Sequence, residues 1–416
     1  MDMRTVIATG GALALVTLAA CGGSGESASG SDEVTVWMYP VIADDEASSE
    51  FWEGVEADFE AEHEDIELDI ELQPWEGRQE KVTTALASGS GPDIILLIPD
   101  QLPQYVEQDA LLPVDEVVNG SEVELLPDAV EAMTVDGQVY SVPIYQTVNT
   151  TSYNTAVLEE AGISEPPTTW DEMLEAAPKL ADEGFATLDY AGNPEETLNL
   201  TFYPLLWQAG GSVFSEDGTE VAFDGPEGVA ALQFLLDLQE AGGLASDVVT
   251  KTSTFDDRGM PTGDAAMTYH TSLQMAERLA EAIGEDDFEL GQPLEGPGGQ
   301  AAFGNPGGLV LAQKAEGNEG ARTFLSYMLR PDVLAGLASE SGYLPPSEEV
   351  ELEGAGEYAS VFKEALPHVN SGEVHPDARQ VMSILAAQIQ EALGGDATAE
   401  EALEAAADEA NALLDE

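Results

Sequence analysis

Strands and helices alternate along the first part of the chain, and this alternation constrains the fold more than any other feature. In the range 66–72, apolar and acidic residues alternate with the period of two expected of a strand with one face in water. The range 94–98 has five consecutive apolar residues, which predicts a strand buried on both faces. Another strand is expected to begin at Val34. Apolar residues at helical spacing in 51–59 predict a helix between this strand and the strand 66–72, and a second helix is predicted at 79–87, before the strand 94–98. The order predicts an α/β fold with a mostly parallel sheet flanked by helices.

The length favours two domains. A chain of 416 residues with 43% hydrophobic content can bury one large core or two ordinary ones. We therefore expect a globular protein with two cores.

The first residues have the features of an export signal. Arg4 precedes an apolar run, 6–20, which is short of the about 20 residues that a membrane span needs. Leu18, Ala19 and Ala20 then lead into Cys21, and this order resembles a lipoprotein signal. We expect that residues 1–20 are removed, that Cys21 carries a lipid and that 21–32 form a flexible tether outside the cytoplasm. An ordinary secretory signal is the alternative.

Cys21 is the only cysteine of the chain. No internal disulfide is therefore possible. No histidine or second cysteine is near it in sequence to make it a nucleophile or a metal ligand, so lipid attachment is its most natural use.

The sequence is strongly acidic, with 81 Asp and Glu against 12 Lys and Arg and a formal net charge of −69. Such a surface repels phosphate backbones, which argues against a nucleic-acid partner. It also repels itself, and salt screens this repulsion. We interpret the acidity as an adaptation to a salty medium.

The range 140–172 predicts an extended segment, a short helix and a new helix start. Residues 142–153 are rich in β-branched and aromatic types, and a helix at 156–161 is expected to end at Gly162. Thr169 and Glu172 have the spacing of a capping box, which places a helix start at Trp170.

The words VPIYQTVNTTSYN and PPTTWDEM in this range, together with GSGPD at 89–93, resemble the extracellular solute-binding proteins of carbohydrate importers, the family of the maltose-binding protein. This resemblance implies a two-lobed periplasmic-binding-protein-like fold whose lobes are joined by crossing hinge segments. It implies that lobe I comprises 33–146 and 303–342, and that lobe II comprises 147–302 and 343–416. The ranges 303–311 and 341–347 would form the second and third crossings.

The resemblance also implies a function. The protein would capture a sugar or oligosaccharide between its lobes and deliver it to the permease of an ABC importer, as a monomer without enzymatic activity. Aromatic faces would stack on the sugar rings, and polar side chains would bind the hydroxyl groups. The candidate ligand-binding residues, each of which could instead serve packing, are Tyr39, Trp75, Glu76, Asp100, Tyr145, Thr147, Asn149, Trp207, Tyr269, Asn305 and Tyr343.

Two other functions stay open at this point. A cationic solute such as a polyamine could bind between Glu76 and Asp100 in an aromatic box. A lipid-anchored glycosidase would need two carboxylates about 5 to 10 Å apart, but with 81 acidic residues such a pair carries no information. The sequence contains no phosphate-binding loop, no nucleophile elbow and no helix-spaced histidine pair, so we expect no catalytic residue, metal or cofactor.

The charge leads to a prediction about stability. Molar salt shortens the screening length to about 3 Å, so the urea midpoint of unfolding should be higher in molar sodium chloride than in dilute buffer. Equal midpoints in both media would contradict the interpretation of the acidity as a salt adaptation.

Overall fold

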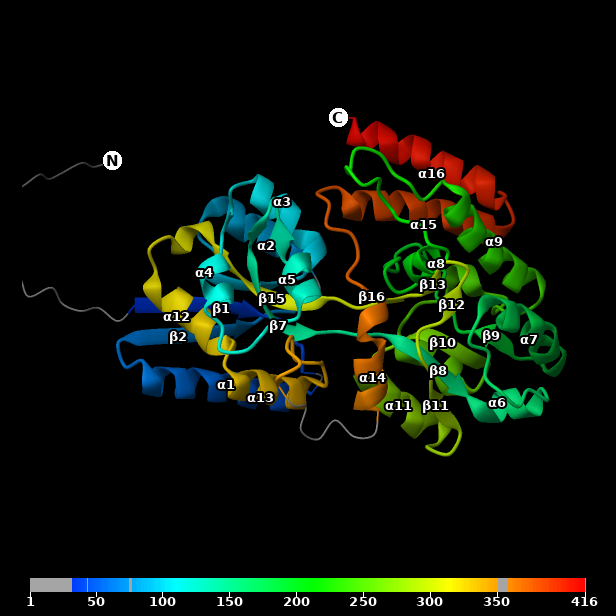
Figure 1. Cartoon of the computed structure of the whole chain (residues 1–416), viewed down its shortest axis with the longest axis horizontal. Coiled ribbons are helices and arrows are strands. Elements are labelled where there is room, and N and C mark those ends of the chain that lie inside the picture. Colours follow the sequence, from blue (N-terminus) through cyan, green and yellow to red (C-terminus); the bar gives the residue numbers. More distant parts are fainter. Residues whose placement is uncertain (1–31, 43, 75–76, 351–357, 416) are drawn as a thin grey trace, which may run out of the picture.

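The structure is a computed structural model that describes residues 32–42, 44–74, 77–350 and 358–415. It contains two lobes side by side, each built on its own β-sheet with helices packed around it (Figure 1). This is the two-lobed α/β fold that the sequence predicts.

The lobe I sheet has six strands in the order β2-β1-β3-β15-β4, and β7 also pairs with β15. Its strands are β1 (Asp32–Met38), β2 (Ile66–Leu72), β3 (Ile94–Leu97), β4 (Leu111–Leu112), β7 (Ser141–Gln146) and β15 (Pro306–Ala312). Its helices are α1 (Asp45–Glu62), α2 (Arg78–Ser88), α3 (Leu102–Glu107), α4 (Asp115–Asn119), α5 (Pro127–Ala132), α12 (Glu319–Met328) and α13 (Pro331–Ser341). A small hairpin, β5 (Thr134–Val135) and β6 (Gln138–Val139), and the 3₁₀ helix η1 (Pro99–Gln101) complete this lobe.

The lobe II sheet has four strands in the order β11-β8-β10-β9. They are β8 (Thr150–Asn154), β9 (Ala186–Leu188), β10 (Ala265–Thr271) and β11 (Phe288–Leu290). The helices of this lobe are α6 (Thr155–Glu160), α7 (Trp170–Glu183), α8 (Phe202–Gln208), α9 (Pro226–Glu240), α10 (Gly259–Thr262), α11 (Leu273–Ile283), α14 (Ala359–Ala365), α15 (Ala378–Gly394) and α16 (Ala399–Leu414). Short pairs join β12 (Glu295–Gly296) to β13 (Gly299–Gln300) and β14 (Ala302–Phe303) to β16 (Val369–Asn370).

The prediction of mostly parallel sheets is confirmed, because one strand in each of the two lobe sheets, β15 in lobe I and β8 in lobe II, runs against the others. In lobe I, β1 is parallel to β2 and β3, but β15 is antiparallel to β3, β4 and β7. In lobe II, β9 and β10 are parallel, and β8 is antiparallel to both β10 and β11. The physical reason lies in the connectivity, because β15 enters the lobe I sheet from the opposite lobe and therefore runs against its neighbours.

The predicted extended segment 142–153 crosses between the two sheets. Its first half is β7 in lobe I and its second half is β8 in lobe II, and β15 brings the chain back beside it (Figure 1). Side-chain hydrogen bonds connect the two crossing segments. Thr147 Oγ1 donates to Asn305 Oδ1 at 2.9 Å, and Asn149 Nδ2 donates to the Phe303 carbonyl at 2.9 Å.

Each lobe has its own hydrophobic core. The lobe I core contains β3, whose four residues are all buried, as the apolar run predicts. The lobe II core lies around α7, α8, α9, α15 and α16. A third cluster contains Val148 and Leu344 from the crossing segments together with Leu279 and Phe362 of lobe II.

Local sequence signals set several boundaries. The capping boxes at Thr169 and Thr398 are confirmed, with Glu172 and Glu401 as their partners. Strand β2 is confirmed as well, but its apolar face is only partly covered because β2 lies at the edge of the sheet, and Leu72 is 37% exposed.

The proposed signal, Cys21 and the tether before residue 32 lie outside the described residues. Among the helices of the described ranges, none has the length and apolar character needed to cross a bilayer.

The glycine at position 307 is required by the crossing. A Cβ atom there would lie 1.9 Å from Cζ of Tyr145 on the paired strand β7. A side chain therefore cannot be added without displacing the Tyr145 ring.

We predict that Gly307→Ala lowers the free energy of unfolding by about 1–3 kcal/mol, the usual cost of overpacking. Gly54→Ala is the control, because Gly54 is exposed in α1 and has no atom within 4 Å of an added Cβ. This change should be neutral or stabilise by up to about 1 kcal/mol. Urea unfolding measures both, and equal midpoints for the two variants would show that the contact is not tight.

Candidate functional site

The lobe I side of the candidate site consists of aromatic rings around a buried arginine. Tyr39 follows the end of β1, and the guanidinium carbon of Arg78 lies 4.3 Å from its ring centroid. Tyr145 of β7 stacks on Tyr343 with ring centroids 4.9 Å apart. The Arg78 guanidinium also donates to the Leu96 carbonyl at 2.7 Å, which fixes it at the end of β3. The sheet thus brings together side chains that are far apart in the sequence.

Asp100 links the two lobes. It lies in η1, directly after the buried strand β3, and its Oδ2 is 2.8 Å from Nη2 of Arg379 on α15 of lobe II. Burial raises the pKa of Asp100, and the guanidinium groups of Arg379 and Arg78 oppose this shift. The other oxygen, Oδ1, is buried and has no hydrogen-bond partner among the described residues. It is therefore an acceptor that a bound molecule could use.

The lobe II side also has aromatic rings and a carboxylate. Tyr203 and Trp207 lie on α8 with ring centroids 6.0 Å apart. Burial raises the pKa of Glu373 to about 7, and a hydrogen bond from Trp207 partly offsets this shift. The Tyr203 hydroxyl is buried without a partner in the described part of the chain. Burial raises its pKa, and the charges of Glu373 in the same lobe and of Asp100 in lobe I add to this effect, so Asp100 acts on it across the lobe boundary.

These residues form one group, which we call the interlobe cluster: Tyr39, Arg78, Asp100, Tyr145, Tyr203, Trp207, Tyr343, Glu373 and Arg379. It offers flat ring faces and hydrogen-bonding groups without protein partners, contributed by both lobes. Such a combination suits a small polar molecule with apolar faces.

Five of the predicted site residues, Tyr39, Asp100, Tyr145, Trp207 and Tyr343, belong to this cluster. Trp75 and Glu76 lie outside the described residues.

The other predicted residues have partners within the protein. Thr147, Asn149 and Asn305 bond across the crossing segments, as described above. The Tyr269 hydroxyl donates to the Thr201 carbonyl inside the lobe II core, which favours a structural role for this residue.

Sequence reasoning missed Arg78, Glu373 and Arg379. A signal for the arginines existed in the composition, because each cation is unusual in a chain with only 12 Lys and Arg. No comparable signal marks Glu373 among 81 acidic residues.

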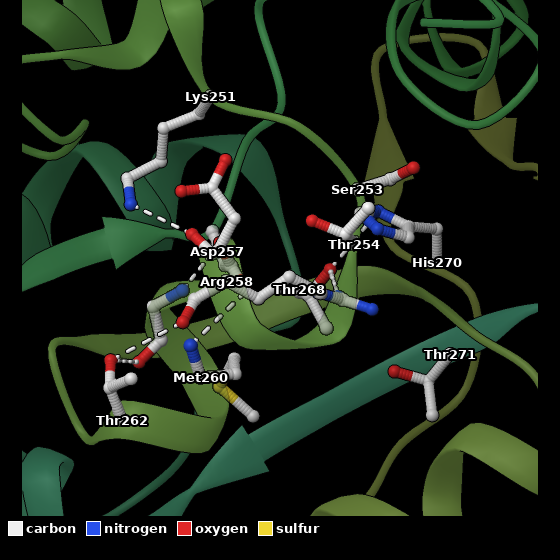
Figure 2. A network of polar contacts seen from close by, with 12 residues as sticks. Lys251, Ser253, Thr254, Asp257, Arg258, Met260, Thr262, Thr268, His270 and Thr271 are labelled. Carbon is white, nitrogen blue, oxygen red and sulfur yellow. Dashed lines mark hydrogen bonds and ion pairs between the residues drawn. The ribbon is translucent and has the colours of Figure 1, made fainter.

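A second polar network lies within lobe II (Figure 2). Asp189 accepts hydrogen bonds from Arg258 Nε at 3.2 Å and from the backbone N–H groups of Gly259 and Met260. Arg258 also donates to Thr268 Oγ1, which lies 3.2 Å from Nδ1 of His270. Burial and the nearby Arg258 lower the pKa of His270 well below its usual value, so this histidine is neutral at pH 7. The network attaches α10 to the sheet, and its contacts are those of a structural element.

Within the described ranges, no group of three or more His, Cys, Asp and Glu side chains is arranged to hold a metal ion.

Comparison with known proteins places these observations in a family. The model of the bacterial extracellular solute-binding proteins matches residues 43–335. The chain therefore belongs to this family of binding proteins, which act outside the cytoplasm.

Individual relatives are distant but match over most of the chain. The diacetylchitobiose-binding protein DasA of Streptomyces coelicolor is 24% identical, over 90% of this chain and 89% of its own. The maltotriose-binding protein of Pyrococcus abyssi is 25% identical, over 78% of this chain and 69% of its own. An ABC transporter solute-binding protein of Thermotoga lettingae, crystallised with α-D-tagatose, is 26% identical with a TM-score of 0.76, over 92% of this chain and all of its own.

The raised pKa of Glu373 predicts a pH dependence of stability. The pKa is 4.5 in a free glutamate and about 7 here, so the folded state binds the proton more tightly. The resulting stability is fully present below pH 4.5 and is lost as the pH rises through about 7. Glu373→Gln should remove this loss, which we expect to be on the order of 2 kcal/mol after allowance for partial exposure.

Urea midpoints of the protein and of Glu373→Gln at pH 5 and pH 8 measure this effect. The variant should gain stability relative to the parent at pH 8 only. Glu404→Gln, an exposed change on α16, is the control and should leave both midpoints unchanged. If the urea midpoint of Glu373→Gln differs from that of the parent by the same amount at both pH values, the pKa of Glu373 is not raised in the folded state.

Proposed function

We propose that this protein captures a sugar or an oligosaccharide between its two lobes and delivers it to the membrane permease of an ABC importer. The observation that carries this proposal is the interlobe cluster, in which both lobes supply aromatic faces and polar groups without protein partners. The names of the relatives agree with it, because diacetylchitobiose, maltotriose and tagatose are all carbohydrates.

The chemistry of a sugar fits the cluster. The C–H face of a sugar ring is apolar and packs on an aromatic face such as that of Tyr145, Tyr343 or Trp207. The hydroxyl groups donate to Asp100 Oδ1 and exchange hydrogen bonds with the Tyr203 hydroxyl, both of which have no partner in the described structure. Residues from both lobes contact the sugar only when the lobes are closed, so the sugar stabilises the closed form.

A cationic solute fits less well. Two guanidinium groups, those of Arg78 and Arg379, already act on Asp100. A polyamine would have to approach the same carboxylate against these positive charges. A neutral sugar meets no such repulsion.

The domain organisation in this proposal follows the sequence prediction. Lobe I comprises 33–146 and 303–342, and lobe II comprises 147–302 and 343–416. Thr147, Asn149 and Asn305 lie where the chain crosses and would act at the hinge, next to the ligand. We retain Trp75 and Glu76 as ligand contacts because they precede Arg78 in the sequence. Tyr269 would support α8 through the hydrogen bond from its hydroxyl to the Thr201 carbonyl.

We also propose how the protein is held at the cell surface. Residues 1–20 would be removed as a lipoprotein signal, Cys21 would carry the lipid, and 21–32 would connect the anchor to lobe I. The anchored monomer would work in a salty medium, in which its net charge of −69 is screened.

Binding experiments test this function. A thermal-shift screen of neutral sugars and of polyamines should give stabilisation by at least one sugar, because a ligand of the folded state raises the unfolding temperature. A rise in the unfolding temperature with polyamines alone would overturn the sugar assignment.

With the sugar identified, Trp207→Ala should weaken its binding at least about tenfold, equal to about 1.4 kcal/mol. Trp37→Ala is the matched control. Trp37 bonds to Glu71 and lies under Lys81, outside the interlobe cluster, and its loss should not change the affinity. An equal loss in both variants would indicate a general effect on folding.

A further inference from the structure

Strand β2 forms an open edge of the lobe I sheet. Among the described strands it pairs with β1 alone, and the seven residues of each strand lie in parallel register. Apolar and acidic residues alternate along β2, and Leu72 at its end is 37% exposed. A long edge strand with free backbone groups is a template on which a strand of another chain can add. The free side of β2 is therefore a surface that the protein has to protect.

Two side chains of α1, which runs beside β2, occupy this edge (Figure 1). Glu60 Oε1 accepts a hydrogen bond from the backbone N–H of Leu68 at 3.0 Å, and Glu56 Oε1 accepts one from the N–H of Ile70 at 2.5 Å. Leu68 and Ile70 are two residues apart, so both N–H groups point to the same side of the strand, away from β1. The donors of the free edge are thus already bonded.

The helix and the strand match in spacing. Glu56 and Glu60 are four residues apart on α1, which corresponds to a rise of about 6 Å along the helix axis. Two residues of a strand rise by about 6.6 Å. Two carboxylates on successive turns of α1 can therefore reach two successive outward N–H groups of β2, and the order of the bonds shows that the helix and the strand run in opposite directions.

The position of Glu56 is costly for a charged group. Burial raises its pKa, and the hydrogen bond from Ile70 opposes this shift, while the charges of Asp69, Glu60 and Glu53 add to it. No ion pair of the described structure includes Glu56 or Glu60. The two carboxylates are therefore held at the strand by backbone N–H groups and not by a basic side chain.

The net charge of −69 cannot protect the edge under all conditions. In dilute buffer it keeps two copies of the chain apart, but molar salt shortens the screening length to about 3 Å and removes most of this repulsion. A partly buried hydrogen bond in direct contact is screened much less. Blocked N–H groups therefore still protect the edge in a salty medium, in which the charge does not.

We propose that the free edge of β2 is a self-association surface for a second copy of this chain, and that Glu56 and Glu60 keep it closed. Without these carboxylates, two copies pair antiparallel through β2 about a twofold axis, with Leu68 of one copy opposite Ile70 of the other. Apolar residues then lie opposite apolar ones, and acidic residues lie opposite acidic ones. Because like charges directly opposite each other destabilise a pair, this association needs salt.

Sedimentation velocity in molar sodium chloride at increasing protein concentration tests the proposal. The parent protein should remain monomeric. Glu56→Ala/Glu60→Ala frees both N–H groups and should shift from the monomer toward the dimer as the concentration rises. Alanine favours a helix, so α1 is retained. A double-alanine variant that stays monomeric at every concentration, or a parent that associates to the same extent, would overturn the proposal.

Two further double variants separate the hydrogen bonds from the charge, because each removes the same two negative charges. Glu56→Gln/Glu60→Gln keeps a carbonyl oxygen that accepts from an N–H group, so it should remain monomeric. Glu50→Ala/Glu53→Ala changes two exposed residues of the same helix and should also remain monomeric. If either variant associates as strongly as the double-alanine variant, the lost charge and not the opened edge is the cause, and the proposal fails.

Amide hydrogen exchange locates the interface. In dilute buffer, where the copies repel each other, the N–H groups of Leu68 and Ile70 should exchange at least about tenfold faster in Glu56→Ala/Glu60→Ala than in the parent. In molar salt the same two groups should become protected again as the dimer forms. New protection that appears only outside β2 would place the contact on another surface and would contradict the proposal.

Discussion

The antiparallel pairing of β7 with β15 is the contact on which the two-lobed arrangement depends. These strands carry the chain out of lobe I and back into it, and both belong to the lobe I sheet. Their pairing requires Gly307, whose missing side chain leaves room for the Tyr145 ring. That ring in turn stacks on Tyr343 in the interlobe cluster. The crossing therefore fixes both the relation between the lobes and part of the interlobe cluster.

The second constraint is electrostatic. With 81 acidic and 12 basic residues, most carboxylates have no basic partner and must remain in water. The two buried arginines of the described structure are placed where carboxylates are also buried. Arg258 bonds to Asp189 inside lobe II, and Arg78 lies near Asp100 in the interlobe cluster. Arg379 then completes the environment of Asp100 from the other lobe. These arginines thus lie beside buried carboxylates at one structural site within lobe II and at the boundary between the lobes.

The boundary between the lobes also holds the hydrogen-bonding groups on which the proposed function depends. The ion pair between Asp100 and Arg379 and the effect of the Asp100 charge on Tyr203 connect the two lobes. A ligand that accepts or donates hydrogen bonds at the unpartnered Asp100 Oδ1 and Tyr203 hydroxyl adds to the same contacts. In the function proposed above, such a ligand would bind a closed form better than an open one, and this difference in affinity would shift the population.

Local patterns in the sequence determined the elements. The apolar run 94–98 forms a strand over its first four residues, all of them buried, and the capping boxes at Thr169 and Thr398 set the starts of α7 and α16. These signals are reliable because they depend on neighbours within a few residues. The direction of β15 within its sheet was not determined in this way, because it depends on which lobe the chain comes from.

The candidate site likewise contains some residues that local sequence patterns indicate and others that only the tertiary structure brings in. The positions of Tyr39 and Asp100 in the candidate site were predictable because strand ends are local features and lie at one edge of the sheet. Arg379 and Glu373 were not, because each acts through a partner hundreds of residues away or on another element. The sequence by itself thus determined the strands, the helix starts and the excess of negative charge, all of which follow from short-range patterns or composition. Only the tertiary structure decided which few of its charges meet, because that depends on how two separately folded halves lie against each other.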